Sequence, residues 1–254
     1  KNPIINTGSL RMSPFFFKMQ KQKTWDFFHV SRYEPRKNIG GFFNVVKSAL
    51  KLKEDLNGVL LISVEPKKLK EIRNFYNSYF TEKERNNFEL ITLDYDLPFP
   101  ISKKTLAHFY NSAKVTLNTH VNEPHGRVVG YSLAAGLPVV GFSDLTQMVP
   151  EDLRKEPFFF VSDNEDELAN LLIKAIDYVD LAYEPELHIK ISNMHSEVGQ
   201  SVFLKNELIS RFNLDDHDWF LNNLDLRLAS HFLYEKSSNG HCQSILNLLY
   251  YLLY

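Results

Sequence analysis

Between residues 25 and 179, short apolar runs alternate with stretches in which apolar side chains recur at helical spacing. The apolar runs predict strands at 25–30, 58–64, 88–93, 114–119, 137–142 and 158–162. The helical periods predict helices at 39–52, 66–84, 102–113, 126–136 and 164–179. Strands that alternate with helices form right-handed βαβ units. The pattern therefore predicts an α/β fold with a mainly parallel, Rossmann-like sheet of about six strands.

Local signals mark where two of these helices begin and end. Ser102 is a predicted N-cap for the helix at 102–113. Gly136 is a predicted left-handed C-cap of the helix at 126–136, and Pro138 prevents that helix from continuing. The apolar positions of the same helix are spaced to bury one face, formed by Val128, Val129, Leu133 and Ala134.

The two ends of the chain follow a different pattern. Residues 1–24 have no clear period and no initiator Met, and we interpret them as a lead-in or a remnant of a preceding domain. The Rossmann-like domain is predicted to occupy residues 25–182, and residues 183–254 predict a helical C-terminal extension. The last apolar segment, 245–254, is too short to span a bilayer and lacks flanking basic residues. We expect it to dock on protein, and a position on a membrane surface is the alternative.

The composition narrows the class of protein. Of 254 residues, 44% are hydrophobic, and the phenylalanines at 15–17, 42–43 and 158–160 fit a core better than a base-stacking surface. A net charge of −2 argues against broad binding of nucleic acid or anionic membranes. The single cysteine, Cys242, excludes an intrachain disulfide framework and fits a reducing compartment. We expect a cytoplasmic protein, with peripheral association at a membrane left open.

Polar loops follow four of the predicted strands, at 31–38, 63–66, 94–99 and 118–126. Ligands of open α/β sheets bind outside the carboxyl ends of the strands, so these loops can share one cleft. The first loop carries three cations, which can bind phosphate oxygens: Arg32, Arg36 and Lys37. A solvated charged loop is the alternative interpretation.

The loop before the helix at 126–136 carries an acid, Glu123, and Gly126 then opens the helix. Unpaired backbone N–H groups at a helix start favour an anion such as a phosphate. A carboxylate there would repel the phosphate, so we expect Glu123 to serve a neighbouring part of the ligand that is rich in hydroxyl groups. A sugar diphosphate would satisfy both groups.

Other chemistries have weaker support. His120, Glu123 and His125 lie close together, but their spacing is not that of a helical zinc site and Pro124 places them in a loop. We expect no metal site, and a loop histidine such as His120 is expected to cap a backbone group or touch a substrate hydroxyl. The sequence has no GxSxG, Walker or GxGxxG motif, which removes the usual support for hydrolase, NTPase and dinucleotide-dehydrogenase functions.

Two of these segments resemble a known family. SRYEPRKNIGGF, from Ser31, resembles the G-R-x-x-x-x-K loop of the donor-binding domain in GT-B-fold glycosyltransferases of the large family 4 group. NEPHGRVVGYSLAAGLPVV, from Asn122, resembles the E-x7-E signature of the same enzymes. The resemblance covers residues 25–179 and implies the C-terminal, nucleotide-sugar-binding half of a GT-B fold.

The resemblance implies roles for residues at the phosphate and sugar end of a donor. Arg32 and Lys37 would hold the diphosphate and stabilise its developing charge, and Glu123 would accept hydrogen bonds from hydroxyls of the transferred sugar. The start of the helix would bind phosphate or sugar through Gly126 and the amides of Arg127, Val128 and Val129.

At the nucleoside end, Tyr131 takes the position of the family's second glutamate, which binds the ribose hydroxyls. Asp94 and Tyr95 fall in the segment that contacts the base through its backbone. The family's Gly-Gly pair after the last signature strand is replaced here, which makes three further residues weaker candidates: Ser143, Asp144 and Thr146.

The implied reaction is transfer of a sugar from a nucleoside diphosphate sugar to a glycan or lipid-linked acceptor, with retention at the anomeric carbon. No metal or other cofactor is implied, and the leaving phosphate would take the acceptor's proton. The expected partner is the N-terminal, acceptor-binding GT-B domain, which this sequence does not contain. The alternative is a catalytically inactive module that binds nucleotide or a partner, as the tyrosine at position 131 and the missing acceptor half would allow.

Overall fold

The computed structural model describes residues 16, 22–94, 101–121, 127–148, 154, 157–179 and 197–212. The chain divides into two compact units, Gly8–Ser192 and a unit made of Lys1–Thr7 with Asn193–Tyr254. In the second unit the structure describes helix α8, Glu197–Phe212, which lies in the predicted helical extension. The predicted domain boundaries at residues 24 and 182 stay predictions. Among the described helices, none combines the length and apolarity needed to cross a membrane.

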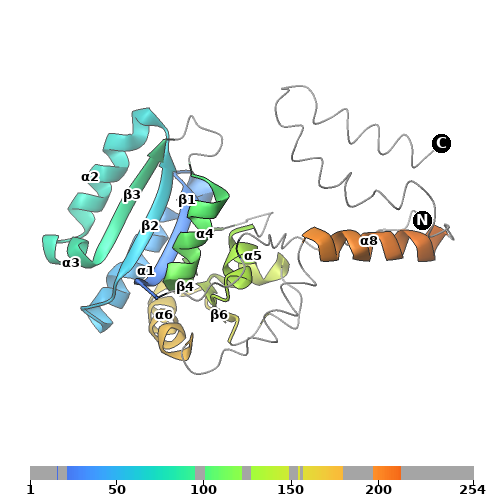
Figure 1. Ribbon diagram of the computed structural model, residues 1–254. Coiled ribbons are helices and arrows are strands. Elements are labelled where there is room, and N and C mark those ends of the chain that lie inside the picture. Colours follow the sequence, from blue (N-terminus) through green and yellow to red (C-terminus); the bar gives the residue numbers. More distant parts are fainter. Residues whose placement is uncertain are drawn as a thin grey trace. The chain divides into compact units, whose positions relative to one another are not determined.

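The first unit is built on a six-stranded parallel sheet with the order β3-β2-β1-β4-β5-β6 (Figure 1). Its strands are β1 Trp25–Arg32, β2 Gly58–Val64, β3 Phe88–Asp94, β4 Ala113–Asn118, β5 Val139–Gly141 and β6 Phe159–Val161. Every pair of neighbouring strands is parallel. The predicted Rossmann-like α/β fold is confirmed.

The helices follow the predicted alternation with the strands. They are α1 Ile39–Leu52, α2 Leu69–Tyr79, α3 Glu82–Asn87, α4 Lys103–Ser112, α5 Arg127–Ala134 and α6 Glu165–Val179. Short 3₁₀ turns lie at Pro35–Lys37, Pro66–Lys68 and Ser143–Met148. Ser102 caps α4 as predicted, because its side chain accepts a hydrogen bond from the amide of Thr105 at 3.0 Å.

Two apolar clusters cover the two faces of the sheet. Phe27 and Leu60 belong to the cluster that contains the buried residues of α1, α2 and α6. Their neighbours Phe28 and Leu61 belong to the other cluster, with residues of α4 and α5. Alternate residues of a strand point to opposite faces, so a central strand that is buried on both sides reads as a continuous apolar run.

The phenylalanines assigned to the core lie in these two clusters. Phe42 and Phe43 are fully buried on α1, and Phe158–Phe160 are buried at β6. Phe16, from the lead-in segment, is also fully buried, and it packs in the cluster of α4 and α5. Phe15 and Phe17 lie outside the described residues.

One prediction about the helices is wrong. The stretch 66–84, expected as one helix, forms a 3₁₀ turn and α2, and the chain then leaves helical geometry at Phe80. Thr81 starts α3 with a capping box, in which its side chain accepts from the amide of Glu84 and the Glu84 side chain accepts from the amide of Thr81. The cap gives the backbone groups at a new helix start their hydrogen bonds, and this favours two short helices over one long helix.

The end of α5 agrees with the prediction made at Gly136. This residue has φ of 74°, the left-handed conformation that glycine adopts without a steric penalty. Its amide donates to the carbonyl of Leu133 at 3.0 Å, and the amide of Leu137 donates to the carbonyl of Ser132 at 2.8 Å. This pair of bonds is a Schellman motif, which ends the helix and turns the chain into β5.

Candidate functional site

The loops that follow β1 and β4 meet at the point where the strand order reverses. Strand β1 pairs with β2 on one side and with β4 on the other, so the chain leaves β1 and β4 in opposite directions across the sheet. The amide of Val121 donates to the carbonyl of Arg36 at 3.0 Å, and the Thr119 hydroxyl donates to the carbonyl of Asn38 at 3.3 Å. These contacts hold the two loops together at the switch point, where open α/β sheets bind ligands.

The loop after β1 has a tight, capped geometry. Pro35 opens a 3₁₀ turn, and Asn38 then adopts the left-handed conformation with φ of 47°. The Asn38 side chain accepts from the amide of Gly41 at 3.2 Å and so caps α1. A Cβ atom at Gly41 would lie 2.5 Å from the side-chain nitrogen (Nδ2) of Asn38. A glycine at this position therefore leaves room for the Asn38 cap.

Lys37 is directed into the junction between the two loops. It is only 8% exposed, and its ammonium lies 3.5 Å from Nδ1 of His120, on the loop after β4. The other ring nitrogen of His120, Nε2, lies 3.2 Å from the Ser31 hydroxyl, which donates to the carbonyl of Arg32 at 3.1 Å.

These contacts fit one arrangement of the hydrogen atoms on His120. Because the Ser31 hydroxyl proton is directed to the carbonyl of Arg32, its oxygen is available to accept from an Nε2–H group of His120. Nδ1 then has a lone pair that can accept from the Lys37 ammonium. The neutral Nε2–H tautomer therefore fits both neighbours and ties Lys37 to the end of β1.

A second histidine lies beneath this junction. His29, on β1, is fully buried, and its ring centroid is 4.9 Å from that of His120 and 4.9 Å from that of Phe42. Burial lowers the pKa of His29 well below its usual value, and the neighbouring His120 and Lys37 lower it further. An interaction with the backbone of Leu117 opposes this lowering of the pKa, although within the described part of the chain neither ring nitrogen makes a hydrogen bond of good geometry. His29 is thus a neutral ring beside the Lys37 charge.

The arginines of the loop are more exposed than Lys37. The side chains of Arg32 and Arg36 are 55% and 52% exposed, and both approach the carboxylate of Glu34, at 3.8 Å and 3.1 Å. With Lys37, the loop carries three cations against one carboxylate. It therefore keeps an excess of positive charge at the carboxyl end of β1.

Helix α5 begins seven residues after His120 in the sequence. It starts at Arg127, and the first amides of an α-helix have no partner within the helix. Arg127 is exposed, Val128 is half-buried and Val129 is buried. The predicted contacts of these amides with phosphate or sugar stay predictions.

Tyr131 packs against other aromatic rings. Its ring is stacked on that of Phe16, with centroids 3.9 Å apart and planes 5° from parallel, and it meets Tyr110 edge-on at 6.2 Å. The side chain is half-buried at the border of the α4 and α5 cluster. Whether it also contacts a nucleoside stays a prediction.

Several predicted site residues are not described by the structure. Glu123, Gly126 and Tyr95 lie outside the described residues, and of Asp94 only the backbone, at the end of β3, is described. Among the described residues, no three His, Cys, Asp or Glu side chains are grouped so as to hold a metal ion.

The weaker candidates after β5 serve the local turn. The Ser143 amide and hydroxyl donate to Asp163 at 3.1 Å and 2.8 Å, and the Thr146 hydroxyl donates to the carbonyl of Ser143 at 2.7 Å. Asp144 lies in the same 3₁₀ turn, Ser143–Met148. These bonds fix the chain after β5, and a ligand role for the three residues stays a prediction.

Two residues of the junction have no counterpart among the predicted site residues. His29 lies within an apolar strand and Ser31 lies near its end. Both belong to the junction because they contact His120, which is 91 positions from His29 and 89 from Ser31 in sequence. The available signal was polarity inside a buried strand, since a buried polar group needs a partner.

Comparisons with known proteins place the fold. The sequence matches no protein-family profile and no curated protein. Sucrose-phosphate synthase from Thermosynechococcus elongatus has a similar structure, with a TM-score of 0.56, 15% identity and coverage of 81% of this chain and 52% of the synthase. TarM has a TM-score of 0.55 and 18% identity, over 76% of this chain and 36% of TarM.

A third similar structure is the pneumococcal O-GlcNAc transferase GtfA, solved with UDP and GlcNAc, with a TM-score of 0.54 and 15% identity. The match covers 80% of this chain and 39% of GtfA. The chain thus spans between about a third and about a half of the length of these proteins. The parallel sheet and its flanking helices have the fold of the C-terminal, Rossmann-like domain of GT-B glycosyltransferases.

Proposed function

We propose that the chain is the donor-binding domain of a glycosyltransferase that transfers a sugar from a nucleoside diphosphate sugar. The observation that carries this proposal is the junction of Lys37 with His120, which unites the loops after β1 and β4 at the switch point of the sheet. The fold shared with GT-B glycosyltransferases supports it. So does GtfA, a transferase of the same fold whose crystals contain UDP and GlcNAc.

In this proposal, the diphosphate binds between the cationic loop and the start of α5. Arg32 and Lys37 hold its oxygens, and the amides of Arg127 and Val128 add oriented dipoles. Negative charge grows on the diphosphate as the bond to the sugar breaks. Fixed positive groups stabilise that charge more than they stabilise the bound donor, and this difference lowers the barrier.

Glu123 would accept hydrogen bonds from hydroxyls of the transferred sugar, and the leaving phosphate would take the proton of the acceptor hydroxyl. Front-face transfer of this kind retains the configuration at the anomeric carbon. No metal ion is needed in the proposal, because the cationic side chains and the helix start supply positive charge. The acceptor is a glycan or a lipid-linked saccharide, and a second domain binds it.

Nucleotide binding by the full chain tests the proposal. Calorimetry with UDP, GDP and ADP should show binding of at least one nucleotide, and Lys37→Met should weaken it about tenfold or more, because a hydrogen bond to a charged group is lost. Lys51→Met is the matched control, since Lys51 is exposed near the far end of the same helix that follows the loop. Thermal unfolding curves of both variants serve as the control that each one folds.

The proposal fails if no nucleoside diphosphate binds, or if Lys37→Met and Lys51→Met bind it equally well. Turnover is measured as hydrolysis or transfer of nucleotide sugars by the chain together with its acceptor-binding domain. Binding without any turnover in that assay would make the chain an inactive nucleotide-binding module. Unchanged turnover in a Glu123→Gln variant would show that the Glu123 carboxylate does not bind the transferred sugar.

A further inference from the structure

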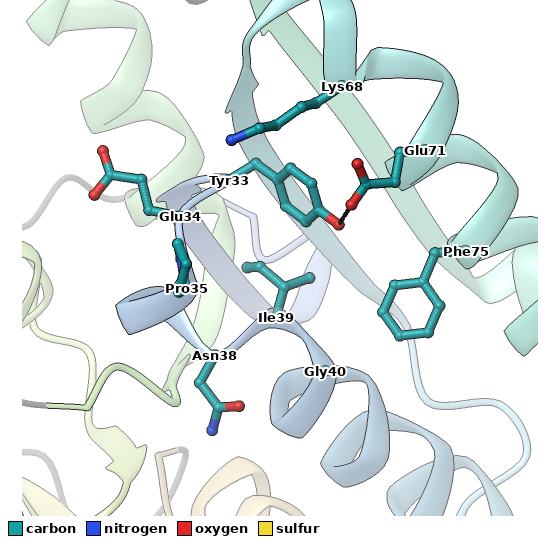
Figure 2. Close-up of a pocket in the computed structure, with 9 residues that line it drawn as sticks. All are labelled: Tyr33, Glu34, Pro35, Asn38, Ile39, Gly40, Lys68, Glu71 and Phe75. Carbon is teal, nitrogen blue, oxygen red and sulfur yellow. Dashed lines mark hydrogen bonds between the residues drawn. The ribbon is translucent and has the colours of Figure 1, made fainter.

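A separate pocket of about 290 Å³ lies on the other side of the loop after β1, between the start of α1 and helix α2 (Figure 2). The volume lies just below the range of about 300–1,000 Å³ for small-molecule sites. The loop contributes Tyr33 and Glu34, α1 contributes Ile39 and Gly40, and the turn and helix after β2 contribute Lys68, Glu71 and Phe75. Lys37 and His120 are not part of its lining.

The pocket has an apolar wall. Figure 2 shows the rings of Tyr33 and Phe75 and the side chain of Ile39 around one space. Phe75 packs on the core, because the centroid of its ring lies 5.0 Å from that of Phe43. A Cβ atom added at Gly40 would meet nothing within 4 Å, so the pocket is open above the first turn of α1.

Polar groups lie beside these apolar side chains. The Tyr33 hydroxyl donates to Oε1 of Glu71 at 2.7 Å, which fixes both side chains (Figure 2). Burial, together with this carboxylate, raises the pKa of Tyr33 to about 12, so the phenol stays neutral. The charged groups of the lining are the carboxylates of Glu34 and Glu71 and the ammonium of Lys68. Arg32 and Arg36 engage Glu34, and Lys68 lies 3.8 Å from the carboxylate of Glu65.

We propose that this pocket binds one neutral sugar ring of a carbohydrate. A sugar ring has a C–H face that fits against Tyr33, Ile39 and Phe75, and hydroxyls that both donate and accept hydrogen bonds. The carboxylate of Glu71 is an acceptor for such hydroxyls, and the Lys68 ammonium is a donor. A phosphate would meet the carboxylates of Glu34 and Glu71, and a cation would meet the positive groups beside them, Lys68, Arg32 and Arg36. The proposal stands on this pocket and does not depend on diphosphate binding at Lys37.

Titration of the ¹⁵N-labelled full chain with methyl glycosides of glucose, galactose, mannose and N-acetylglucosamine tests the proposal. At least one glycoside should shift the amide resonances of Tyr33, Gly40 and Glu71 in a saturable manner at millimolar concentration. Gly40→Leu should weaken these shifts, because Gly40 lines the pocket and a leucine adds bulk at its edge. Gly40→Ala, which adds only a Cβ into open space, should keep them.

Glu71→Gln is a second variant that keeps the shape of the pocket and removes the charged acceptor. It should weaken the glycoside about tenfold, the effect of one hydrogen bond to a charged group. The proposal is overturned if none of the glycosides shifts these resonances, or if Gly40→Leu and Glu71→Gln both leave the affinity for the glycoside unchanged. It is also overturned if inorganic phosphate or methylguanidinium binds there more tightly than every glycoside.

Discussion

The ammonium of Lys37 lies beside two imidazole rings, where most lysines extend into solvent. Nδ1 of His120 lies 3.5 Å from it and Nε2 of the same ring lies 3.2 Å from the Ser31 hydroxyl, while His29 lies beside His120 as a neutral ring. A buried charge is costly unless polar groups compensate for it. At the scale of single residues, the site therefore depends on side chains that never need to touch a ligand, because they set where the Lys37 charge is held.

The lowered pKa of His29 predicts how stability depends on pH. In the unfolded chain this histidine takes up a proton near its usual pKa of 6.5, whereas in the folded chain it stays neutral to a lower pH. Below pH 6.5 the unfolded state thus binds more protons, and the free energy of unfolding falls as the pH falls. The slope from this group is at most about 1.4 kcal/mol per pH unit.

His29→Phe should remove this part of the slope, because the ring still packs on Phe42 but no longer titrates. Urea unfolding of both proteins at several values between about pH 5 and 6.5 measures the difference. This pH range lies above the titration of the carboxyl groups with lowered pKa, such as Glu54 and Glu84, whose usual pKa is 4.5. Their contribution to the free energy of unfolding is lost only at lower pH. Parallel slopes for the two proteins would contradict the assignment.

At the scale of elements, the turn between β1 and α1 gives the cationic loop its shape. Asn38 ends the 3₁₀ turn with its backbone amide, which donates to the carbonyl of Pro35, and caps α1 with its side chain. The two glycines that follow are alike in sequence but not in surroundings, since a Cβ at Gly41 would collide with Asn38 and Glu165, whereas one at Gly40 would meet open space. The pair therefore provides a matched test of the cap.

Gly41→Ala should lower the free energy of unfolding by about 1 kcal/mol, the usual value of an N-cap, because Asn38 must move from its capping position. Gly40→Ala should raise it by about 0.4–1 kcal/mol, since the unfolded chain loses conformational freedom without a clash. Urea unfolding of the two variants against the parent chain is the measurement. Equal effects of the two substitutions would show that the cap does not limit the size of residue 41.

For the whole molecule, the first unit contains its own core. Both apolar clusters draw their buried members from residues between Phe16 and Ile176, which lie within Gly8–Ser192. The six-stranded sheet and the junction of Lys37 with His120 lie in the same span. Every described element that the proposed nucleotide site uses thus belongs to one compact unit.

A chain of residues 8–192 should therefore fold by itself, with a single cooperative unfolding transition by circular dichroism and calorimetry. It should bind the same nucleoside diphosphate as the full chain, with an affinity that agrees within about threefold, which is less than 1 kcal/mol. The full chain under identical conditions is the reference. A shortened chain without a cooperative transition would contradict the independence of this unit.

The alternation of apolar runs and helical periods determined the α/β fold, and it placed β2 and α1 at their observed bounds, because these elements form from neighbouring residues. Gly136 and Ser102 marked helix ends for the same local reason. The break at Thr81 was missed, since a capping box can be satisfied inside a stretch that also fits a continuous helix.

The sequence also indicated that Arg32, Lys37 and His120 belong to strand ends that share an edge. Only the tertiary structure decided that Lys37 turns inward to His120, that Ser31 and His29 complete the junction, and that Tyr131 packs on Phe16. These contacts join residues 83 or more positions apart. No local pattern specifies such pairs, because they depend on how the β-strands are ordered and on which helices cover each face of the sheet.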